Sequence, residues 1–178
     1  MMASGNNRNI GIEMVYQDFA LAGNMSIHEN IFLGREVQKP LLGLPLLNTK
    51  AQREMAHEHL NRLKIHVKSV DQNVEDLSGG QRQSVAIARA VYFNAKILIM
   101  DEPTAALGVH ETQMVAELIQ ELKKQGLGIF LISHDTREML ELCDRVSVMK
   151  NGQMIGTERV EDVTEDDILS MIIMGAKP

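Results

Sequence analysis

The sequence predicts an α/β fold with a parallel sheet, and this prediction rests on two apolar runs and the helix between them. The runs are Lys96 to Met100 and Gly128 to Ile132, and polar residues follow each of them. Uninterrupted apolar runs of this length are typical of strands in a parallel sheet that is covered on both faces. The segment Val109 to Lys124 has apolar residues at helical spacing, and Gly126 follows as a helix end. Strand, helix and strand in this order predict a parallel crossover.

Further elements are expected on both sides of this unit. Upstream, Thr49 is expected to cap a helix that ends near Leu63, and Ser78 to precede an Ala-rich helix from Gln81 to Tyr92. Downstream, we expect a short helix that is capped by Asp135 and ends at Leu142. A strand from Arg145 to Met149, a turn at Asn151-Gly152 and a strand from Gln153 to Thr157 should follow as a hairpin. The last expected element is a helix from Thr164 to Met171. The predicted division is a polar tail (1–9), a core strand with a loop (10–25), a helical subdomain (26–90) and an α/β core (91–178).

Length, charge and cysteine content narrow the class of protein. The 178 residues, 44% of them apolar, are enough for one packed domain. A net charge of -6 gives no basic surface for nucleic acid, so we expect no nucleic-acid partner. Cys143 is the only cysteine and the segment Met1 to Asn9 has no signal-peptide pattern, which predicts a cytoplasmic protein. No apolar stretch approaches the roughly 20 residues that span a bilayer.

A serine and two glycines precede the Ala-rich helix. Backbone N–H groups and a hydroxyl at a helix N-terminus form an anion site, and glycine lets a phosphate approach the backbone closely. Ser78, Gly79, Gly80 and Gln81 are therefore candidate phosphate-binding residues. Taken alone, the same residues also fit a turn followed by a helix cap.

Two adjacent carboxylates follow the first apolar run, at the strand end where open α/β sheets bind ligands. Asp101 is a candidate ligand of Mg²⁺, and Glu102 a candidate to orient or deprotonate an attacking water. His134 follows the second run and is a candidate to donate to a phosphate oxygen. Alone, the carboxylates also fit a solvated turn before Pro103, and the histidine a structural role.

The order and spacing of four motifs resemble the ATP-binding cassette (ABC) ATPases. Gln17 in VYQDFAL matches the Q-loop, LSGGQRQSVAIARA (77–90) the signature, ILIMDEPTAAL (97–107) the Walker B strand and D-loop, and LISHD (131–135) the H-switch. The resemblance implies a P-loop NTPase (RecA-like) core that lacks its phosphate-loop strand, with an ABC-type helical subdomain that ends in the signature helix.

The resemblance also implies a role for each candidate residue, with ATP and Mg²⁺ as cofactors. Gln17 would sense the metal and the γ-phosphate, Asp101 would hold Mg²⁺, Glu102 would act as the base and His134 would hold the γ-phosphate. Ser78, Gly79, Gly80 and Gln81 would contact ATP bound to a second ABC ATPase domain in a head-to-tail dimer.

The family's phosphate loop, G-x-x-x-x-G-K-[ST], does not occur in this sequence, and only sixteen residues precede Gln17. Three explanations stay open: a truncated copy of a longer ATPase, which we favour, a short protein completed by another chain, or a nonfunctional remnant. In the family that loop's strand lies beside the strand before His134, so we expect an exposed apolar sheet edge. Gly108 also stands where many members have an aspartate.

Within the family, GIEMVYQ, ENIFLGRE and RQSVAIARA most resemble importers of monosaccharides. This resemblance implies transmembrane permease subunits as partners, indirectly a periplasmic or extracellular sugar-binding protein, and a location on the inner face of the cell membrane. The expected function is the ATPase subunit of a sugar importer, incomplete and inactive alone. The alternative is a non-hydrolysing partner that lends its signature loop to a complete ATPase.

Overall fold

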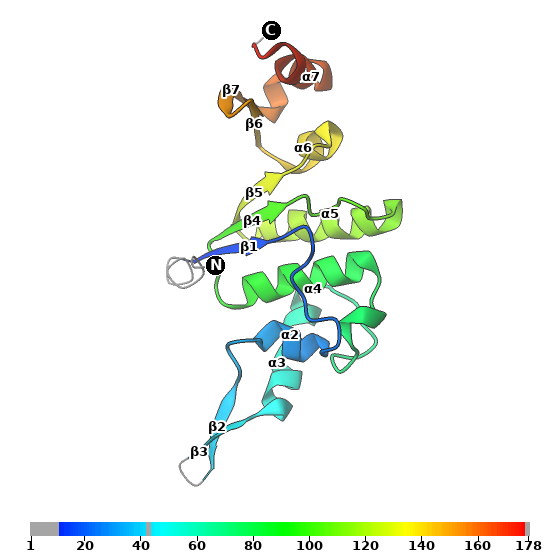
Figure 1. Ribbon diagram of the computed structural model, residues 1–178, viewed down its shortest axis with the longest axis vertical. Helices are drawn as coiled ribbons and strands as arrows, with labels where there is room; N and C mark the ends of the chain where they lie inside the picture. Colours follow the sequence, from blue (N-terminus) through cyan, green and yellow to red (C-terminus); the bar gives the residue numbers. More distant parts are fainter. Residues whose placement is uncertain (1–10, 42–43, 177–178) are drawn as a thin grey trace. The chain divides into compact units, whose positions relative to one another are not determined.

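The protein is described by a computed structural model that covers residues 11–41 and 44–176. The chain forms two compact units, Met1–Phe130 and Leu131–Pro178, and each is described by itself. Figure 1 labels their helices and strands. No helix in the described part of the chain is long and apolar enough to cross a membrane. The finer division into tail, loop, helical subdomain and core stays a prediction.

The first unit contains the sheet that the sequence predicted. Strand β1 (Ile12–Val15) pairs in parallel with β4 (Ile97–Asp101), and Val15 lies opposite Met100. Strand β5 (Gly128–Ile132) is the other neighbour of β4, and the Gly128 N–H donates to the Lys96 carbonyl at 3.0 Å. Strand β4 begins one residue later than predicted and includes Asp101 as its last residue.

Two long helices build the core beside this sheet. Helix α4 (Gly79–Tyr92) contacts β1 and α5 (Val109–Lys124), and the bounds predicted for α5 are confirmed. The Ser78 hydroxyl accepts a hydrogen bond from the Gln81 N–H at 3.3 Å, so α4 starts at Gly79 rather than at Gln81. The shared interior is aliphatic and includes Val85, Ile87, Leu98, Val115 and Ile119.

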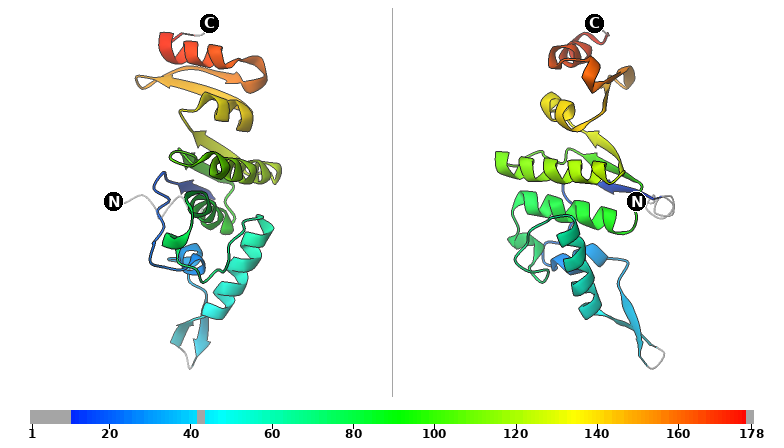
Figure 2. Two further views of the ribbon diagram at one scale, coloured as in Figure 1. Left: turned by 90° about the vertical axis from the view of Figure 1, so that its right-hand side faces the viewer. Right: turned by 180° about the vertical axis from the view of Figure 1, so that it is seen from behind.

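The region between β1 and α4 contains helices and also a hairpin that the sequence did not predict. It comprises α2 (Ile27–Phe32), β2 (Gln38–Leu41), β3 (Leu44–Leu47), α3 (Thr49–Arg62) and a 3₁₀ turn η2 (Val74–Asp76). Asn48 caps α3, because its side chain accepts the Ala51 N–H, and the predicted cap at Thr49 is therefore wrong. Figure 2 shows the hairpin of β2 and β3 extending beyond α2 and α3.

The hairpin was not predicted because its sequence carries weak strand signals. Pro40 and Pro45 lie directly opposite each other in the antiparallel register, and proline donates no hydrogen bond to a ladder. Leu44 and Leu47 are more than half exposed, so the apolar run in this segment does not mark a buried strand. The hairpin forms without the alternation of apolar and polar residues that indicates a half-buried sheet.

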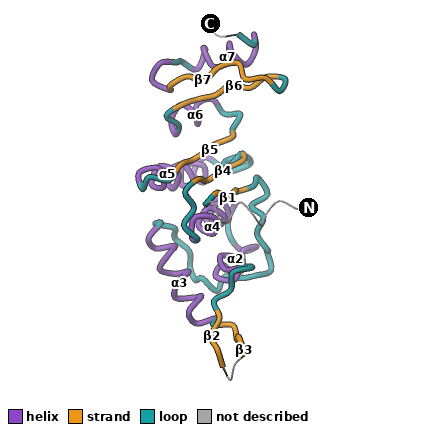
Figure 3. The backbone as a smooth tube through the Cα atoms, turned by 90° about the vertical axis from the view of Figure 1, so that its left-hand side faces the viewer, coloured by secondary structure: helices purple, strands orange, loops and turns teal. Residues whose placement is uncertain are grey.

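The second unit has the elements that the sequence predicted. It contains α6 (Thr136–Leu142), β6 (Arg145–Lys150), β7 (Gln153–Arg159), a 3₁₀ turn η3 (Val160–Asp162) and α7 (Glu165–Met174). Strands β6 and β7 are antiparallel, and Asn151 and Gly152 in the turn both have positive φ angles, 50° and 76°. Helix α7 lies against β6 (Figure 3) and buries Ile168 and Met171 there with Val146 and Val148.

Strand β5 differs from the prediction in its burial. Its side chains alternate between half-buried and exposed, with Phe130 67% and Ile132 49% exposed. Residues two apart on a strand share one face, so Gly128, Phe130 and Ile132 lie on the exposed side. The prediction of a sheet covered on both faces is therefore wrong at β5. Within the described residues β5 is an outer strand of the sheet, in the order β1-β4-β5, which agrees with the predicted apolar edge.

Candidate nucleotide site

The carboxyl ends of β1 and β4 bring Gln17 and Asp101 together. Because β1 and β4 are parallel with Val15 opposite Met100, the residues that follow them leave the sheet at the same edge. Tyr16, Gln17, Asp18 and Asp101 line one shallow hollow there. This is the edge at which open α/β sheets bind their ligands.

The hollow presents oxygen donors of the kind that Mg²⁺ prefers. Asp101 and Asp18 contribute carboxylates and Gln17 an amide oxygen. In residues 11–41 and 44–176, no group of three or more His, Cys, Asp or Glu side chains is arranged to hold a metal. Such a donor set fits Mg²⁺ that is bound together with a phosphate. In proteins Mg²⁺ is usually held by one or two carboxylates, and water and phosphate oxygens fill the rest of its coordination shell. Asp18 was missed in the sequence, where its position next to Gln17 was the available signal.

Glu102 has an unusual backbone conformation directly after β4. Its φ angle is 51°, in the left-handed region that non-glycine residues adopt at a cost of about 1–2 kcal/mol. The residue is half-buried, and the Ala105 N–H donates to its carbonyl at 3.2 Å. Strained residues of this kind concentrate at functional sites. The chemical role of Glu102 stays a prediction.

The loop that carries Gln17 is held by the signature helix. Phe19 and Ala20 have positive φ angles of 62° and 47°, and the Arg89 guanidinium donates to both carbonyls, at 3.3 Å and 2.7 Å. The Arg82 guanidinium lies 5.5 Å from the centre of the Phe19 ring. Sequence reasoning missed Arg82 and Arg89, although arginines in an otherwise Ala-rich, buried helix were a signal.

Asn30 fixes the downstream end of the same loop. It is fully buried on α2, and its Oδ1 accepts the Ala22 N–H at 2.8 Å. Its Nδ2 donates to the carbonyls of Ala22 and Ser26, each at 3.0 Å. Buried polar groups satisfied in this way specify one conformation. The loop after Gln17 is therefore tied to α4 by Arg89 and to α2 by Asn30.

The four signature residues form a separate group at the N-terminus of α4. The Ser78 N–H donates to the Gln81 side-chain oxygen at 3.2 Å, and the Gln81 amide donates to the His66 carbonyl at 3.2 Å. A methyl group added to Gly79 would lie 2.9 Å from Leu107 Cδ2, and one added to Gly80 would lie 2.8 Å from Glu111 Cβ. Both glycines therefore allow the close approach of α4 and α5, in addition to any phosphate.

His134 lies in the second unit, directly after β5. It is exposed, between Ser133 and Asp135. The Ser133 hydroxyl donates to Glu138 at 2.8 Å and accepts the Asp135 N–H at 3.1 Å. The Asp135 carboxylate accepts the N–H groups of Arg137 and Glu138 in the first turn of α6. These bonds fix the backbone around His134. Its role toward a phosphate stays a prediction.

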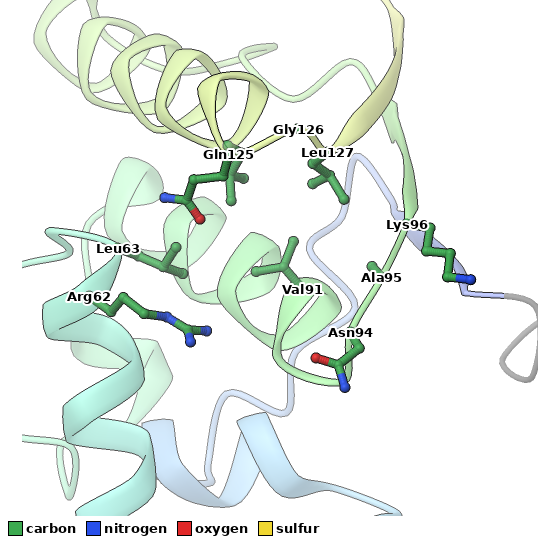
Figure 4. A pocket seen from close by; sticks show the side chains of 10 residues that line it. Arg62, Leu63, Val91, Asn94, Ala95, Lys96, Gln125, Gly126 and Leu127 are labelled. Atoms are coloured by element: carbon green, nitrogen blue, oxygen red, sulfur yellow. The ribbon is translucent and has the colours of Figure 1, made fainter.

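A second hollow, of about 290 Å³, lies at the opposite end of β4 (Figure 4). Leu63, Val91 and Leu127 contribute apolar side chains from three different segments, and Lys96 precedes the strand. None of the predicted site residues lines it. It also lies at the amino end of β4, where α/β sheets do not usually bind ligands.

Solved structures with the same fold place this chain in a class of nucleotide-binding proteins. The structure of cbiO1 from Clostridium perfringens, part of the transporter complex cbiONQ, matches with a TM-score of 0.71 and 28% identity, over 90% of this chain and 62% of that one. A dimeric post-hydrolysis structure of the ATP-binding cassette MJ0796, bound to ADP and Pi, matches with a TM-score of 0.65 and 27% identity, over 84% and 62%. The fold is thus that of an α/β P-loop NTPase.

Sequence comparison identifies the family. The family model described as ABC transporter matches residues 3–105. The xylose/arabinose import ATP-binding protein XylG of Sulfolobus acidocaldarius is 44% identical over 93% of this chain, and the fructose import ATP-binding protein FrcA of Rhizobium meliloti is 42% identical over 96%. This chain belongs to the ABC transporter ATP-binding family. It spans 64% of the length of the first relative and 67% of the second.

Proposed function

We propose that this chain supplies the Q-loop, signature, Walker B and H-switch of an ATP-binding subunit of an ABC importer, which couples ATP hydrolysis to the uptake of a monosaccharide, and that the 178 residues alone are inactive because they contain no phosphate-loop motif. Its relatives include proteins named for xylose/arabinose, fructose and ribose import. The observation that carries the proposal is the pairing of β1 and β4, which gathers Gln17 and Asp101 at one sheet edge.

The residues at this edge would divide the chemistry among them. When bound with ATP, Mg²⁺ offsets the charge that develops on the phosphates. Asp101 and Gln17 would hold the metal, and Glu102 would take the proton of the attacking water. His134 would donate a hydrogen bond to the γ-phosphate. The strained backbone of Glu102 and the anchored loop after Gln17 support these assignments, because catalysis needs positions fixed in advance.

The signature residues would serve a partner. Ser78, Gly79, Gly80 and Gln81 would contact ATP held by a second ABC ATPase domain, in a head-to-tail dimer. That dimer would work on the inner face of the membrane with transmembrane permease subunits, and an external sugar-binding protein would deliver the sugar. The exposed Ser78 at the N-terminus of α4 supports this role, because helix N-termini attract anions.

The trans role can be tested by mixing the chain with a complete ABC ATPase domain, for example that of FrcA. We expect ATP turnover by the mixture to exceed that of the ATPase domain alone. Ser78→Arg should abolish the increase, whereas Ser69→Arg, at an exposed serine away from the helix N-terminus, should retain it. An unchanged turnover, or the same increase with Ser78→Arg, would count against the proposal.

A second test concerns binding of Mg-ATP by the 178-residue polypeptide alone. A ligand at about 100 times its Kd stabilises a fold by about 2.7 kcal/mol. For a domain of this size this corresponds to a rise in Tm of about 5–10 °C. We expect a much smaller rise, because the sequence has no phosphate-loop motif to grip the phosphates. A rise in Tm of the full amount, about 5–10 °C, would contradict the expectation that the polypeptide alone binds Mg-ATP poorly.

A further inference from the structure

The N-termini of α4 and α5 meet at one carboxylate. Glu111 lies in the first turn of α5, and its Oε2 accepts the Gly108 N–H at 3.2 Å. A Cβ built on Gly79 would lie 3.5 Å and 3.8 Å from the two oxygens of the same carboxylate. The carboxylate therefore lies beside the backbone of the signature loop, Ser78 to Gly80.

Hydrogen bonds hold this carboxylate in its charged form. The pKa of Glu111 is lowered mainly by the Gly108 N–H, then by the Ser78 hydroxyl and the N–H groups of Gly80 and Gly79. Three of these four donors belong to the signature loop. The direct hydrogen bond comes from Gly108, and the signature-loop donors lie beside the carboxylate and favour its charged form, as both helix N-termini do.

We propose that the Glu111 carboxylate is an internal anion that occupies the phosphate-binding donors of the signature loop, and that an incoming phosphate displaces it. This inference rests on the proposed role of the signature, because the donors in question are those that would contact a partner's ATP. Each N–H makes one good hydrogen bond, so the carboxylate and a phosphate oxygen compete for it. Two anions side by side also repel each other.

Displacement would affect both helices. When a phosphate takes the donors of Ser78, Gly79 and Gly80, Glu111 loses most of the groups that hold it. This side chain links the signature loop to the turn from Thr104 to Gly108, which precedes α5, and Leu107 of the same turn also packs against Gly79. Arrival of a phosphate at the signature would therefore be sensed at the turn that follows Asp101 and Glu102.

The experiment is a titration of the ¹⁵N-labelled chain with inorganic phosphate, followed at the amide resonances of Gly79 and Gly80. It compares the wild type with Glu111→Gln, which keeps an oxygen to accept the Gly108 N–H but removes the charge. We expect Glu111→Gln to bind phosphate about tenfold more tightly, which corresponds to about 1.4 kcal/mol. Glu117→Gln, at an exposed position on the same helix, makes the same change in net charge and should bind as the wild type does.

The failures of the two proposals are distinguishable. Equal phosphate affinity in the wild type and in Glu111→Gln, with shifts at Gly79 and Gly80 in both, would overturn the internal anion and leave the anion site intact. No phosphate-dependent shift in either chain would overturn the anion site of the signature and the internal anion with it.

A second measurement needs no variant and therefore does not depend on how a variant folds. The pKa of Glu111 is followed through its side-chain ¹³C resonance with and without phosphate. Displacement from its donors should raise this pKa toward the ordinary value of a glutamate. If phosphate shifts Gly79 and Gly80 but leaves the Glu111 pKa unchanged, the proposal is wrong.

Discussion

At the scale of single residues, two physical reasons explain why glycine occupies positions 79 and 80 of the signature. Glycine before a helix suits a phosphate that approaches the backbone, and this reason is visible in the sequence. The second reason is visible only in the structure, where a Cβ added to Gly79 would meet Leu107 in the turn before α5, and one added to Gly80 would meet Glu111 in the first turn of α5. A side chain at either position therefore disturbs packing even when no nucleotide is bound.

Gly80→Ala tests this packing. Alanine is normally the better helix former by about 1 kcal/mol, so without a clash the substitution would stabilise α4. Because its Cβ would lie 2.8 Å from the Glu111 Cβ, we expect instead a loss of about 1–3 kcal/mol of unfolding free energy, measured in urea. Gly23→Ala, where the added Cβ makes an ordinary 3.6 Å contact with Glu75 Cβ, serves as the control. A gain in stability for Gly80→Ala would refute the clash.

At the scale of elements, α3 joins α4 through a buried histidine. His59 Nε2 lies 2.8 Å from the Ala88 carbonyl, and its ring packs edge-on against Tyr92 with 4.8 Å between ring centres. Burial lowers the pKa of His59 because it disfavours the charged ring; the Ala88 carbonyl opposes this effect and the Arg62 charge adds to it. The neutral ring is thus the form that fits between α3 and α4.

The pH dependence of stability follows from this direction. Because the pKa of His59 is lower in the folded chain than its ordinary 6.5, the unfolded chain binds more protons just below pH 6.5. We expect stability to fall as the pH drops through 6.5, by at most about 1.4 kcal/mol per pH unit from this residue. His28, whose pKa burial also lowers, contributes in the same direction.

Urea unfolding between pH 5 and 8 measures this slope. His59→Gln should flatten it, whereas His57→Gln, at an exposed position on the same helix, should leave it unchanged. If the slope in His59→Gln equals that of the wild type, the buried ring does not titrate as proposed.

A second feature at this scale is the apolar face of β5. Exposed strands with apolar side chains promote association, and Phe130 is 67% exposed on this strand. We expect Phe130→Lys to slow aggregation at 37 °C, followed by light scattering, because charges on such strands oppose pairing. Val109→Lys adds the same charge at a residue 91% exposed on α5 and should have little effect. If both variants slow aggregation equally, the change in net charge explains the effect and the exposed face of β5 does not.

At the scale of the whole molecule, the chain consists of two units with separate cores. The second unit, Leu131–Pro178, relies on a small cluster of Val146, Val148, Ile168 and Met171. Units of fewer than about 60 residues bury a small fraction of their surface and are marginal by themselves. The second unit is therefore expected to open at a lower free energy than the first.

Native-state hydrogen exchange tests this difference. Amides of β6 and β7 should open more readily than those of α4. Ile168→Ala removes a fully buried side chain and should lower the protection of β6 and β7 by about 2–5 kcal/mol while leaving α4 unaffected. Leu169→Ala, at a residue 38% exposed on the same helix, should change little. Loss of protection in α4 as well would show that the chain unfolds as one unit.

Much of the fold could be predicted because the relevant signals are local. The bounds of α5 and β5 followed from apolar spacing and from Gly126, and the cap of α6 from Asp135. Each of these signals acts within a few residues of chain. The hairpin of β2 and β3 could not be predicted, because Pro40 and Pro45 weaken the strand pattern. Its two strands are held by their pairing with each other, which depends on context more than on the local sequence.

For the candidate site, the sequence by itself determined the kinds of chemical group and their order: Gln17, the signature, the two carboxylates at the carboxyl end of β4 and His134. Only the tertiary structure decided which groups share a surface. Arg89 holds the carbonyls of Phe19 and Ala20 from the signature helix, and Glu111 lies against Gly79 and Gly80 from α5. These contacts join residues far apart in the chain, and packing rather than local spacing places them, because a side chain bonds whatever the fold brings within reach.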